Sequence, residues 1–204
     1  MITIIDYGSG NIRAITNIYD QYKIDYKIAS QPSDVVGAER IILPGVGAFD
    51  ETMNLLIDSG FKTVLDVEVL EREVPVLGIC VGMHVLCESS EEGSLPGLGW
   101  IKGSVKKIDE SSLKEKPYLP HLGWNSISIL KPTFLFDGVD KETGFYFLHS
   151  FYMDCSNETD VMTKTNYGKV FASAVNCKNI YGVQFHPEKS HTNGVFLLRN
   201  FAKI

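Results

Sequence analysis

The sequence has few cysteines, no long apolar run and no cluster of basic residues. Its four cysteines form no C-x-x-C pair and show no zinc-site spacing with histidine, which argues against the common dithiol and zinc motifs. No run reaches the about 18 apolar residues that a membrane-spanning helix needs, so we expect no membrane association. With a net charge of −6 and no Lys/Arg stretch, the chain lacks the basic surface typical of nucleic-acid-binding proteins.

What the chain does have is enough apolar sequence for a substantial core. Of its 204 residues, 44% are hydrophobic and 22% are charged, which suits one domain spanning residues 1–204. The opening segment MITIID runs directly into an apolar stretch without a basic region before it, so we expect no signal peptide. Together with the scarcity of cysteine, this predicts a reduced, cytoplasmic protein.

Strand-like and helix-like segments alternate in the first half of the chain. Continuous apolar runs alternating with amphipathic segments are typical of an α/β fold, with an open, mostly parallel sheet and helices on both faces. The second half contains successive strand-like segments and turns, which predict an antiparallel extension of that sheet. The predicted strands are 2–6, 26–30, 40–45, 74–80, 97–108, 124–130, 144–153, 161–167, 170–177 and 180–186; the predicted helices are 11–22, 48–58, 61–72 and 193–204.

The segment GICVG places Cys80 where an apolar strand ends, with Gly78 and Gly82 two residues to either side. This is the G-x-nucleophile-x-G spacing of a nucleophile elbow, in which glycines make room for a sharp strand-to-helix turn. A helix starting at Val81 would direct its N-terminus at the sulfur and favour the thiolate. The alternative is an ordinary core cysteine in a strand–helix turn.

The segment VQFHPEKS supplies a base and a carboxylate for that cysteine. His186 follows an apolar strand, Pro187 fixes the turn, and Glu188 comes two residues after the histidine. A histidine at a strand end can deprotonate a nearby thiol, and a carboxylate can hold its tautomer. The alternative is a histidine that only caps a strand, but GICVG and VQFHPEKS together favour a Cys80–His186–Glu188 triad.

Two glycine-rich segments follow other strands. In LPGVGAF, Gly45 and Gly47 allow close approach of the backbone to a ligand and can complete an oxyanion hole, although a plain turn would look the same. DYGSGN lacks both the third glycine of a dinucleotide-binding motif and a P-loop lysine, so it does not indicate a nucleotide site.

Taken in order, DYGSGN, LPGVGAF, GICVGM, ESSEEG, PHLGWN, LHSF, FASAV and QFHPEKS resemble the motifs of the class I, or triad, glutamine amidotransferases. Within that class they resemble the HisH family, the glutaminase subunits of imidazole glycerol phosphate synthase, and the resemblance covers nearly the whole chain. The resemblance implies a flavodoxin-like class I amidotransferase fold. It also implies that Cys80 attacks the side-chain amide of glutamine, His186 moves the proton to the leaving ammonia, and Glu188 orients His186. No metal and no cofactor are implied.

The resemblance assigns further residues around the nucleophile. The oxyanion would be stabilised by the amide of Val81 and by Val46 or Gly47. The substrate-binding residues would be Gly45, His84, Ser150 and Phe151. Two of these depart from the family, which usually has glutamine in place of His84 and tyrosine in place of Phe151. We therefore expect His84 to weaken or alter glutamine binding.

The resemblance also implies a partner, a HisF-type (β/α)8 cyclase that forms a heterodimer with the chain, receives its ammonia and activates it. The joint reaction would yield imidazole glycerol phosphate and aminoimidazole carboxamide ribotide in histidine biosynthesis. The implied interface residues are Asn11, His121, Trp124 and Asn125. For Trp124 and Asn125 the alternative is an ordinary strand start with a core tryptophan.

Three other functions stay open from the sequence. GLGWI and FYFLHSF resemble HisH-type paralogues that supply ammonia for amination of a nucleotide-activated sugar in surface-polysaccharide synthesis. A cysteine peptidase or deglycase of related fold also has an elbow cysteine, but HPE and PHLGWN argue against it. An inactive, regulatory homologue is the third, and the intact triad argues against that.

Overall fold

The computed structural model describes residues 1–113 and 119–204. Five strands form the parallel part of the main sheet, in the order β2-β1-β3-β4-β13, and each neighbouring pair is parallel. This is the flavodoxin-like order, in which ligands bind beyond the carboxyl ends of the strands. The predicted fold class is confirmed. The strands are β1 (Ile2–Ile5), β2 (Tyr26–Ala29), β3 (Arg40–Gly45), β4 (Val76–Cys80) and β13 (Ile180–Val183).

The predicted antiparallel extension is also confirmed. The sheet continues from β13 through β12 and β11 to β8, and these pairs are antiparallel, so the whole sheet has eight strands. The three strands are β12 (Lys169–Cys177), β11 (Val161–Tyr167) and β8 (Ser128–Ile129).

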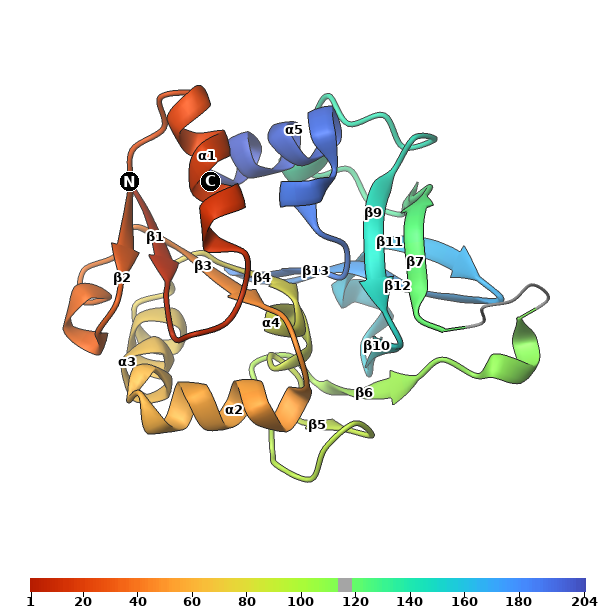
Figure 1. The fold of residues 1–204 in the computed structure, drawn as a ribbon, viewed down its shortest axis with the longest axis horizontal. Helices are drawn as coiled ribbons and strands as arrows, with labels where there is room; N and C mark the ends of the chain where they lie inside the picture. The colour runs from red at the N-terminus through yellow and green to blue at the C-terminus, as the bar shows by residue number, and fades with distance from the viewer. Residues whose placement is uncertain (114–118) are drawn as a thin grey trace.

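Helices cover both faces of the parallel part, as Figure 1 shows: α1 and α5 lie on one face, and α2 and α3 on the other. The helices are α1 (Ile12–Gln21), α2 (Phe49–Asp58), α3 (Phe61–Asp66) and α5 (His191–Phe201). The helix predicted over 61–72 changes at Val67 into a π-helical turn, Val67–Glu71. Each helix buries one apolar side, for example Ile15 and Tyr19 of α1, which is why the amphipathic period predicted these helices well.

Two small sheets complete the structure beside the main one. β10 (Phe151–Cys155) pairs with β6 (Gly103–Lys107), which pairs with β5 (Ser89–Ser90). β7 (His121–Asn125) pairs with β9 (Phe145–His149), and the two lie side by side in Figure 1. The prediction of one strand over 144–153 was therefore wrong. The chain bends at Ser150 and passes from one small sheet to the other, which turns this residue toward the site described below.

Other boundaries differ from the predicted ones. The strand predicted over 97–108 is confined to β6, the one predicted over 124–130 is divided between β7 and β8, and the one over 180–186 ends at Val183. Single 3₁₀ turns occupy Pro32–Asp34, Glu110–Ser112, Phe134–Phe136, Glu158–Asp160 and Pro187–Lys189. Over the described ranges, no helix has the length and apolarity needed to cross a membrane.

Candidate active site

Cys80 lies on a strained elbow at the carboxyl end of β4. Its backbone angles are φ 55° and ψ −112°, a conformation that costs free energy for a residue with a side chain and that clusters at functional sites. The two glycines of the motif make the turn sterically feasible. A Cβ atom on Gly78 would lie 2.5 Å from the carbonyl oxygen of Gly82, and one on Gly82 would lie 2.0 Å from that of Leu43.

The helix expected after the elbow is a single turn, α4 (Val81–His84). The field of so short a helix is small, so the predicted help of a helix dipole to the thiolate is weaker than the sequence indicated. The amide of Val81 is nonetheless the first of the helix, and the first amides of a helix have no intrahelical acceptor. That position suits the oxyanion role predicted for Val81.

The predicted base and carboxylate are paired in the structure. His186 follows β13, and its Nδ1 lies 2.9 Å from Oε1 of Glu188, with side chains only 3% and 2% exposed. Burial by itself lowers the pKa of His186. Hydrogen bonding and charge from Cys80 and Glu188 outweigh burial and raise that pKa to about 10. The protonated form of the imidazole is therefore favoured by its two neighbours, Cys80 and Glu188.

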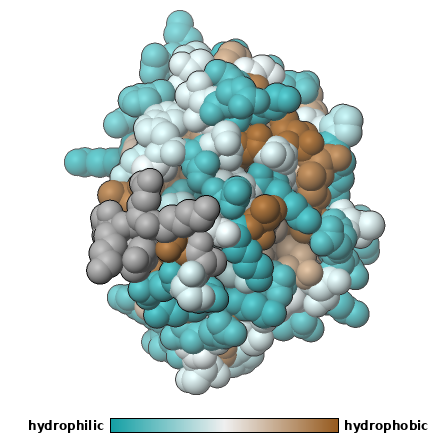
Figure 2. Space-filling view, turned by 90° about the vertical axis from the view of Figure 1, so that its right-hand side faces the viewer, coloured by the Kyte–Doolittle hydropathy of each residue, from teal (hydrophilic) through white to brown (hydrophobic). Residues whose placement is uncertain are grey.

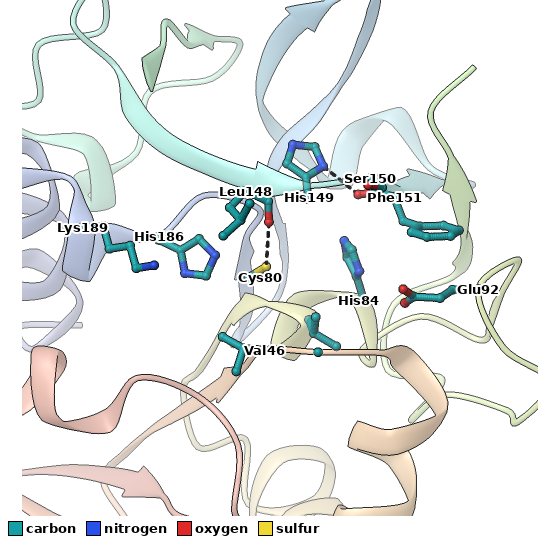
Figure 3. A pocket seen from close by; sticks show the side chains of 12 residues that line it. Val46, Cys80, His84, Glu92, Leu148, His149, Ser150, Phe151, His186 and Lys189 are labelled. Atoms are coloured by element: carbon teal, nitrogen blue, oxygen red, sulfur yellow. Dashed lines mark hydrogen bonds between the residues drawn. The ribbon is translucent and has the colours of Figure 1, made fainter. Parts of the chain in front are cut away.

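Three neighbouring strands bring these groups together. β3, β4 and β13 end side by side, and the imidazole of His186 lies beside the thiol of Cys80 in Figure 3. The thiol hydrogen can also turn to the carbonyl oxygen of Leu148, 4.0 Å from the sulfur. Cys80 is only 4% exposed, and it lines the cavity at this edge of the sheet.

The segment predicted to complete the oxyanion hole is held by Ser9. The amide of Val46 donates a hydrogen bond to the Ser9 hydroxyl at 3.0 Å, and that hydroxyl donates to the carbonyl oxygen of Val46 at 2.8 Å. In this conformation the Val46 amide is engaged and cannot bind an oxyanion. Gly47 follows with φ 101°. Gly45 lies behind the cavity, where a Cβ would come within 2.5 Å of the Gly82 nitrogen, so it shapes the elbow and does not line the cavity as predicted.

A cavity of about 160 Å³ opens at the nucleophile. Its size suits a ligand smaller than the drug-sized molecules that fill about 300–1,000 Å³. Several predicted residues line it, and four lining residues were not predicted: Glu92, Leu148, His149 and Lys189. The predicted lining residues are Val46, Gly47, Cys80, Val81, His84, Ser150, Phe151 and His186.

Of the unpredicted lining residues, Glu92 directs its carboxyl group toward the cavity opposite the triad (Figure 3). Its Oε2 accepts the amide of Phe49 at 3.0 Å, and burial raises its pKa. The motif ESSEEG, which the resemblance included, contains this residue. The acidic side chains of that motif are the sequence signal that could have identified Glu92, because a carboxylate can bind the ammonium group of an amino-acid substrate.

His84 is buried in the wall of the cavity and is neutral. Its Nε2 lies 2.7 Å from Oε1 of Gln184, a fully buried side chain at the end of β13. Burial lowers the pKa of His84 to about 4, and the hydrogen bond to Gln184 opposes that shift only partly. Among the described residues, neither Nδ1 of His84 nor Nε2 of Gln184 has a hydrogen-bond partner. The imidazole therefore offers an uncharged polar edge near the cavity.

The residues predicted to face a partner divide into two groups. Asn11 is exposed and precedes α1, and Trp124 is 42% exposed. Asn125 is half-buried and bonds within the chain. His121 is only 3% exposed and is bonded to His149. In this conformation the side chain of His121 belongs to the interior, so a direct contact with a partner does not fit it.

The site combines an elbow cysteine with a buried histidine–carboxylate pair, which is the arrangement of a cysteine amidase. The sequence model of the family Glutamine amidotransferase class-I matches residues 3–204. A solved glutamine amidotransferase superposes with a TM-score of 0.72 at 17% sequence identity, covering 100% of both chains, a likeness that concerns the fold alone. The chain belongs to the class-I glutamine amidotransferases, as its motifs predicted.

Comparison with full-length relatives identifies the family within this class. The chain is 47% identical over 204 residues to the imidazole glycerol phosphate synthase subunit HisH of Leptospira borgpetersenii, and 48% identical over 204 residues to that of Bdellovibrio bacteriovorus. In each case 100% of both chains is covered. Within the class, the chain is therefore a member of the HisH family.

Proposed function

We propose that the chain hydrolyses glutamine as the glutaminase subunit of an imidazole glycerol phosphate synthase, with Cys80, His186 and Glu188 as its catalytic residues. The observation that carries the residue assignment is the buried His186–Glu188 pair beside the elbow cysteine. The thiolate of Cys80 attacks the side-chain amide carbon of glutamine. In the resulting tetrahedral intermediate, His186 donates its proton to the departing nitrogen, the C–N bond breaks, ammonia leaves and a thioester to Cys80 remains. Water, deprotonated by His186, then attacks the thioester and releases glutamate.

The walls of the cavity suit the rest of the glutamine molecule. The carboxylate of Glu92 complements the α-ammonium group, and the backbone at Ser150 and Phe151 provides hydrogen-bonding groups for the α-carboxylate side. The neutral edge of His84 borders the same space. These placements leave the side-chain amide of glutamine pointing at Cys80.

The oxyanion strand, residues 44–47, gives the enzyme a resting state. While Ser9 holds both the amide and the carbonyl of Val46, the Val46 amide is not available to the tetrahedral intermediate. Turning the peptide that joins Gly45 to Val46 would add a second donor, and loss of one such donor typically costs about 10²–10³-fold in rate. A partner that favours the turned peptide would therefore switch the glutaminase on.

The partner is a HisF-type (β/α)8 cyclase, and the exposed side of β7 suits its docking. Leu122 is 61% exposed and Trp124 is 42% exposed. The Trp124 ring stacks on His191 at 5.4 Å, beside a hollow of about 410 Å³. Figure 2 looks onto the side of the molecule where β7 lies and shows apolar patches among hydrophilic side chains. Patches of this kind are typical of protein interfaces.

The experiment that tests the proposal measures glutamate release from glutamine under three conditions: the chain alone, the chain with a HisF barrel, and both with the aminoimidazole ribotide substrate of the barrel. A low rate alone that rises steeply in the full mixture supports the assignment. A flat low rate, with Cys80 still labelled by a diazoketone analogue of glutamine, would reject the histidine-pathway acceptor and favour amination of a nucleotide-activated sugar.

A further inference from the structure

Two histidines outside the triad form a hydrogen-bonded pair. One of them belongs to β7, and the other lines the cavity. His121 and His149 are directly opposite each other in the antiparallel β7–β9 pair. Nδ1 of His121 lies 2.9 Å from Nε2 of His149, and Nδ1 of His149 lies 2.8 Å from the carbonyl oxygen of Phe151. On the other side, Nδ2 of Asn125 lies 3.2 Å from Nε2 of His121. Four groups are thus joined in one row.

The carbonyl group at one end of this row fixes which atom donates in each of its hydrogen bonds. The carbonyl of Phe151 can only accept, so Nδ1 of His149 carries a proton. Burial lowers the pKa of His149 well below its usual value and that of His121 to about 4, so both rings are neutral and carry one proton each. Nε2 of His149 must then accept from Nδ1 of His121, whose own Nε2 accepts from Asn125. Both imidazoles are therefore Nδ1–H tautomers.

The row ends at the part of the chain that meets the substrate. Residues 148–151 comprise the end of β9, the bend at Ser150 and the start of β10, and all four line the cavity. Within this bend, the Leu148 carbonyl faces Cys80, the Ser150 carbonyl accepts the amide of Ile108, and the Phe151 carbonyl accepts from His149. Figure 3 shows the His149 ring turned away from Cys80 and bonded to the backbone of the bend. His149 therefore supports the wall from behind.

We propose that His121 and His149 are positioning residues, which hold the 148–151 backbone against glutamine and connect it to Asn125 on β7. The proposal rests on the proposed function for the identity of the substrate. A displacement of β7 at Asn125 would move His121, and through His149 it would move the Phe151 carbonyl. The row is thus a physical connection between the exposed strand and the substrate-binding wall.

A second role for His121 competes with this one, because its ring also fills space. It stacks on Phe147 with centroids 4.7 Å apart and on Tyr167 with centroids 4.0 Å apart. Phenylalanine at position 121 would keep this stack and remove the hydrogen bonds. Asparagine would lose the stack, but its amide nitrogen takes the place of Nδ1 and can still donate to His149. The two substitutions therefore separate packing from positioning.

The first test reads the tautomers in the unmodified protein. Long-range ¹H–¹⁵N spectra of protein labelled with ¹⁵N-histidine distinguish Nδ1–H from Nε2–H rings. We expect both His121 and His149 to be Nδ1–H at neutral pH. An Nε2–H ring or an imidazolium at either position would overturn the proposal, whatever the glutaminase activity proves to be. Absence of glutaminase activity with both rings Nδ1–H would instead reject the proposed function and leave the row intact.

The second test measures KM and kcat for glutamine with His121→Phe and His121→Asn. Loss of one neutral hydrogen bond that orients the wall should raise KM about 5–10-fold in His121→Phe, with kcat changed less. We expect His121→Asn to recover most of the wild-type KM, even though it is the less well packed variant. The reverse order, with phenylalanine near wild type and asparagine impaired, would show that His121 acts only by packing.

Discussion

The two sides of the cavity use buried histidines in opposite states. His186 lies beside Glu188 and Cys80, and its pKa is raised to about 10. His84 and His121 lie beside neutral groups, and burial lowers their pKa values to about 4. The exposed fractions of the three residues are similar, at 2–3%. The partner, and not the depth of burial, therefore decides whether a histidine in this protein carries charge.

Charged and neutral histidines have different roles in the site. The charged hydrogen bonds between Cys80, His186 and Glu188 move protons and make a nucleophile. The neutral ones, which join His84 to Gln184, His121 to His149 and Ser9 to Val46, fix the position of walls and backbone. Breaking a charged bond should remove chemistry, whereas breaking a neutral bond should shift binding or basal rate by about tenfold or less.

The largest effect should come from Cys80→Ala, which removes the nucleophile. We expect glutaminase activity to fall by about 10⁴-fold or more, because no other thiol reaches the substrate carbon. The pKa of His186 should also fall, since the thiolate helps to raise it. Glutamate release and an NMR titration of His186 measure the two effects. Cys87→Ala, at a buried thiol behind the elbow, is the control. If Cys80→Ala kept a tenth of the activity, the nucleophile would have been assigned wrongly.

Glu188→Gln should make the environment of His186 resemble that of His149. The change keeps the size of the side chain but removes its charge, so the pKa of His186 should drop from about 10. We expect kcat to fall by about 10²-fold, the scale of general acid–base catalysis. Glu91→Gln serves as the control, because Glu91 is exposed and does not line the cavity. A kcat within threefold of wild type would show that orientation by Glu188 is dispensable.

The charged side of the cavity was predicted from the sequence because its residues occur in short motifs. Cys80 with its two glycines and His186 with Glu188 each lie within five residues, and strand order places both at one sheet edge. The parallel sheet and its helices were predicted for a similar reason, since each strand and helix has its own local apolar pattern.

The neutral side depends on residues that are far apart in the chain. His121 and His149 are 28 residues apart and meet through the register of β7 and β9, while His84 and Gln184 are 100 residues apart. The continuous apolar run over 144–153 concealed the bend at Ser150, because a run of this kind has no feature that marks a change of sheet. Ser9 stood in a motif that was excluded as a nucleotide site, and nothing local showed that it would hold Val46.

Ser9→Ala should raise the basal glutaminase rate, unlike the two substitutions above. It removes both hydrogen bonds that hold Val46, and two neutral bonds at about 1 kcal/mol each bias the strand by enough for a rise of up to about 30-fold. The stimulation by the partner should shrink by the same factor, because the glutaminase rate of the fully stimulated enzyme stays the same. Assays with and without the barrel measure both quantities.

The control for Ser9→Ala is Tyr7→Phe. The Tyr7 hydroxyl donates to the Pro44 carbonyl at 2.5 Å, so this variant loosens the same strand without releasing the Val46 amide. We expect its basal rate to stay near that of wild type. An unchanged basal rate in Ser9→Ala, or an equal rise in both variants, would mean that Ser9 does not control the oxyanion strand.

The smallest kinetic effect should come from His84→Gln. The same substitution should also change the pH dependence of the stability of the protein. Below pH 6.5 the unfolded chain protonates His84, whereas the folded protein resists protonation until about pH 4. The unfolded state therefore binds more protons in this window, and stability falls as the pH drops from 6.5 to 4, by up to roughly 3 kcal/mol from this residue. His84→Gln should lose less stability over the window, and its KM for glutamine should fall about threefold by restoring a hydrogen-bonding amide.

Urea unfolding at pH 7 and pH 4.5 measures this effect, with His191→Gln at an exposed position as the control. His121 and His149 stay in both proteins, so part of the acid sensitivity should persist in His84→Gln. His186 contributes with the opposite sign: its raised pKa favours the folded state at neutral pH, and that contribution is lost only as the pH rises toward 10. An equal loss of stability in wild type and His84→Gln between pH 7 and 4.5 would show that His84 is not held neutral by burial, and the contrast between the two sides of the cavity would then depend on His121 and His149 alone.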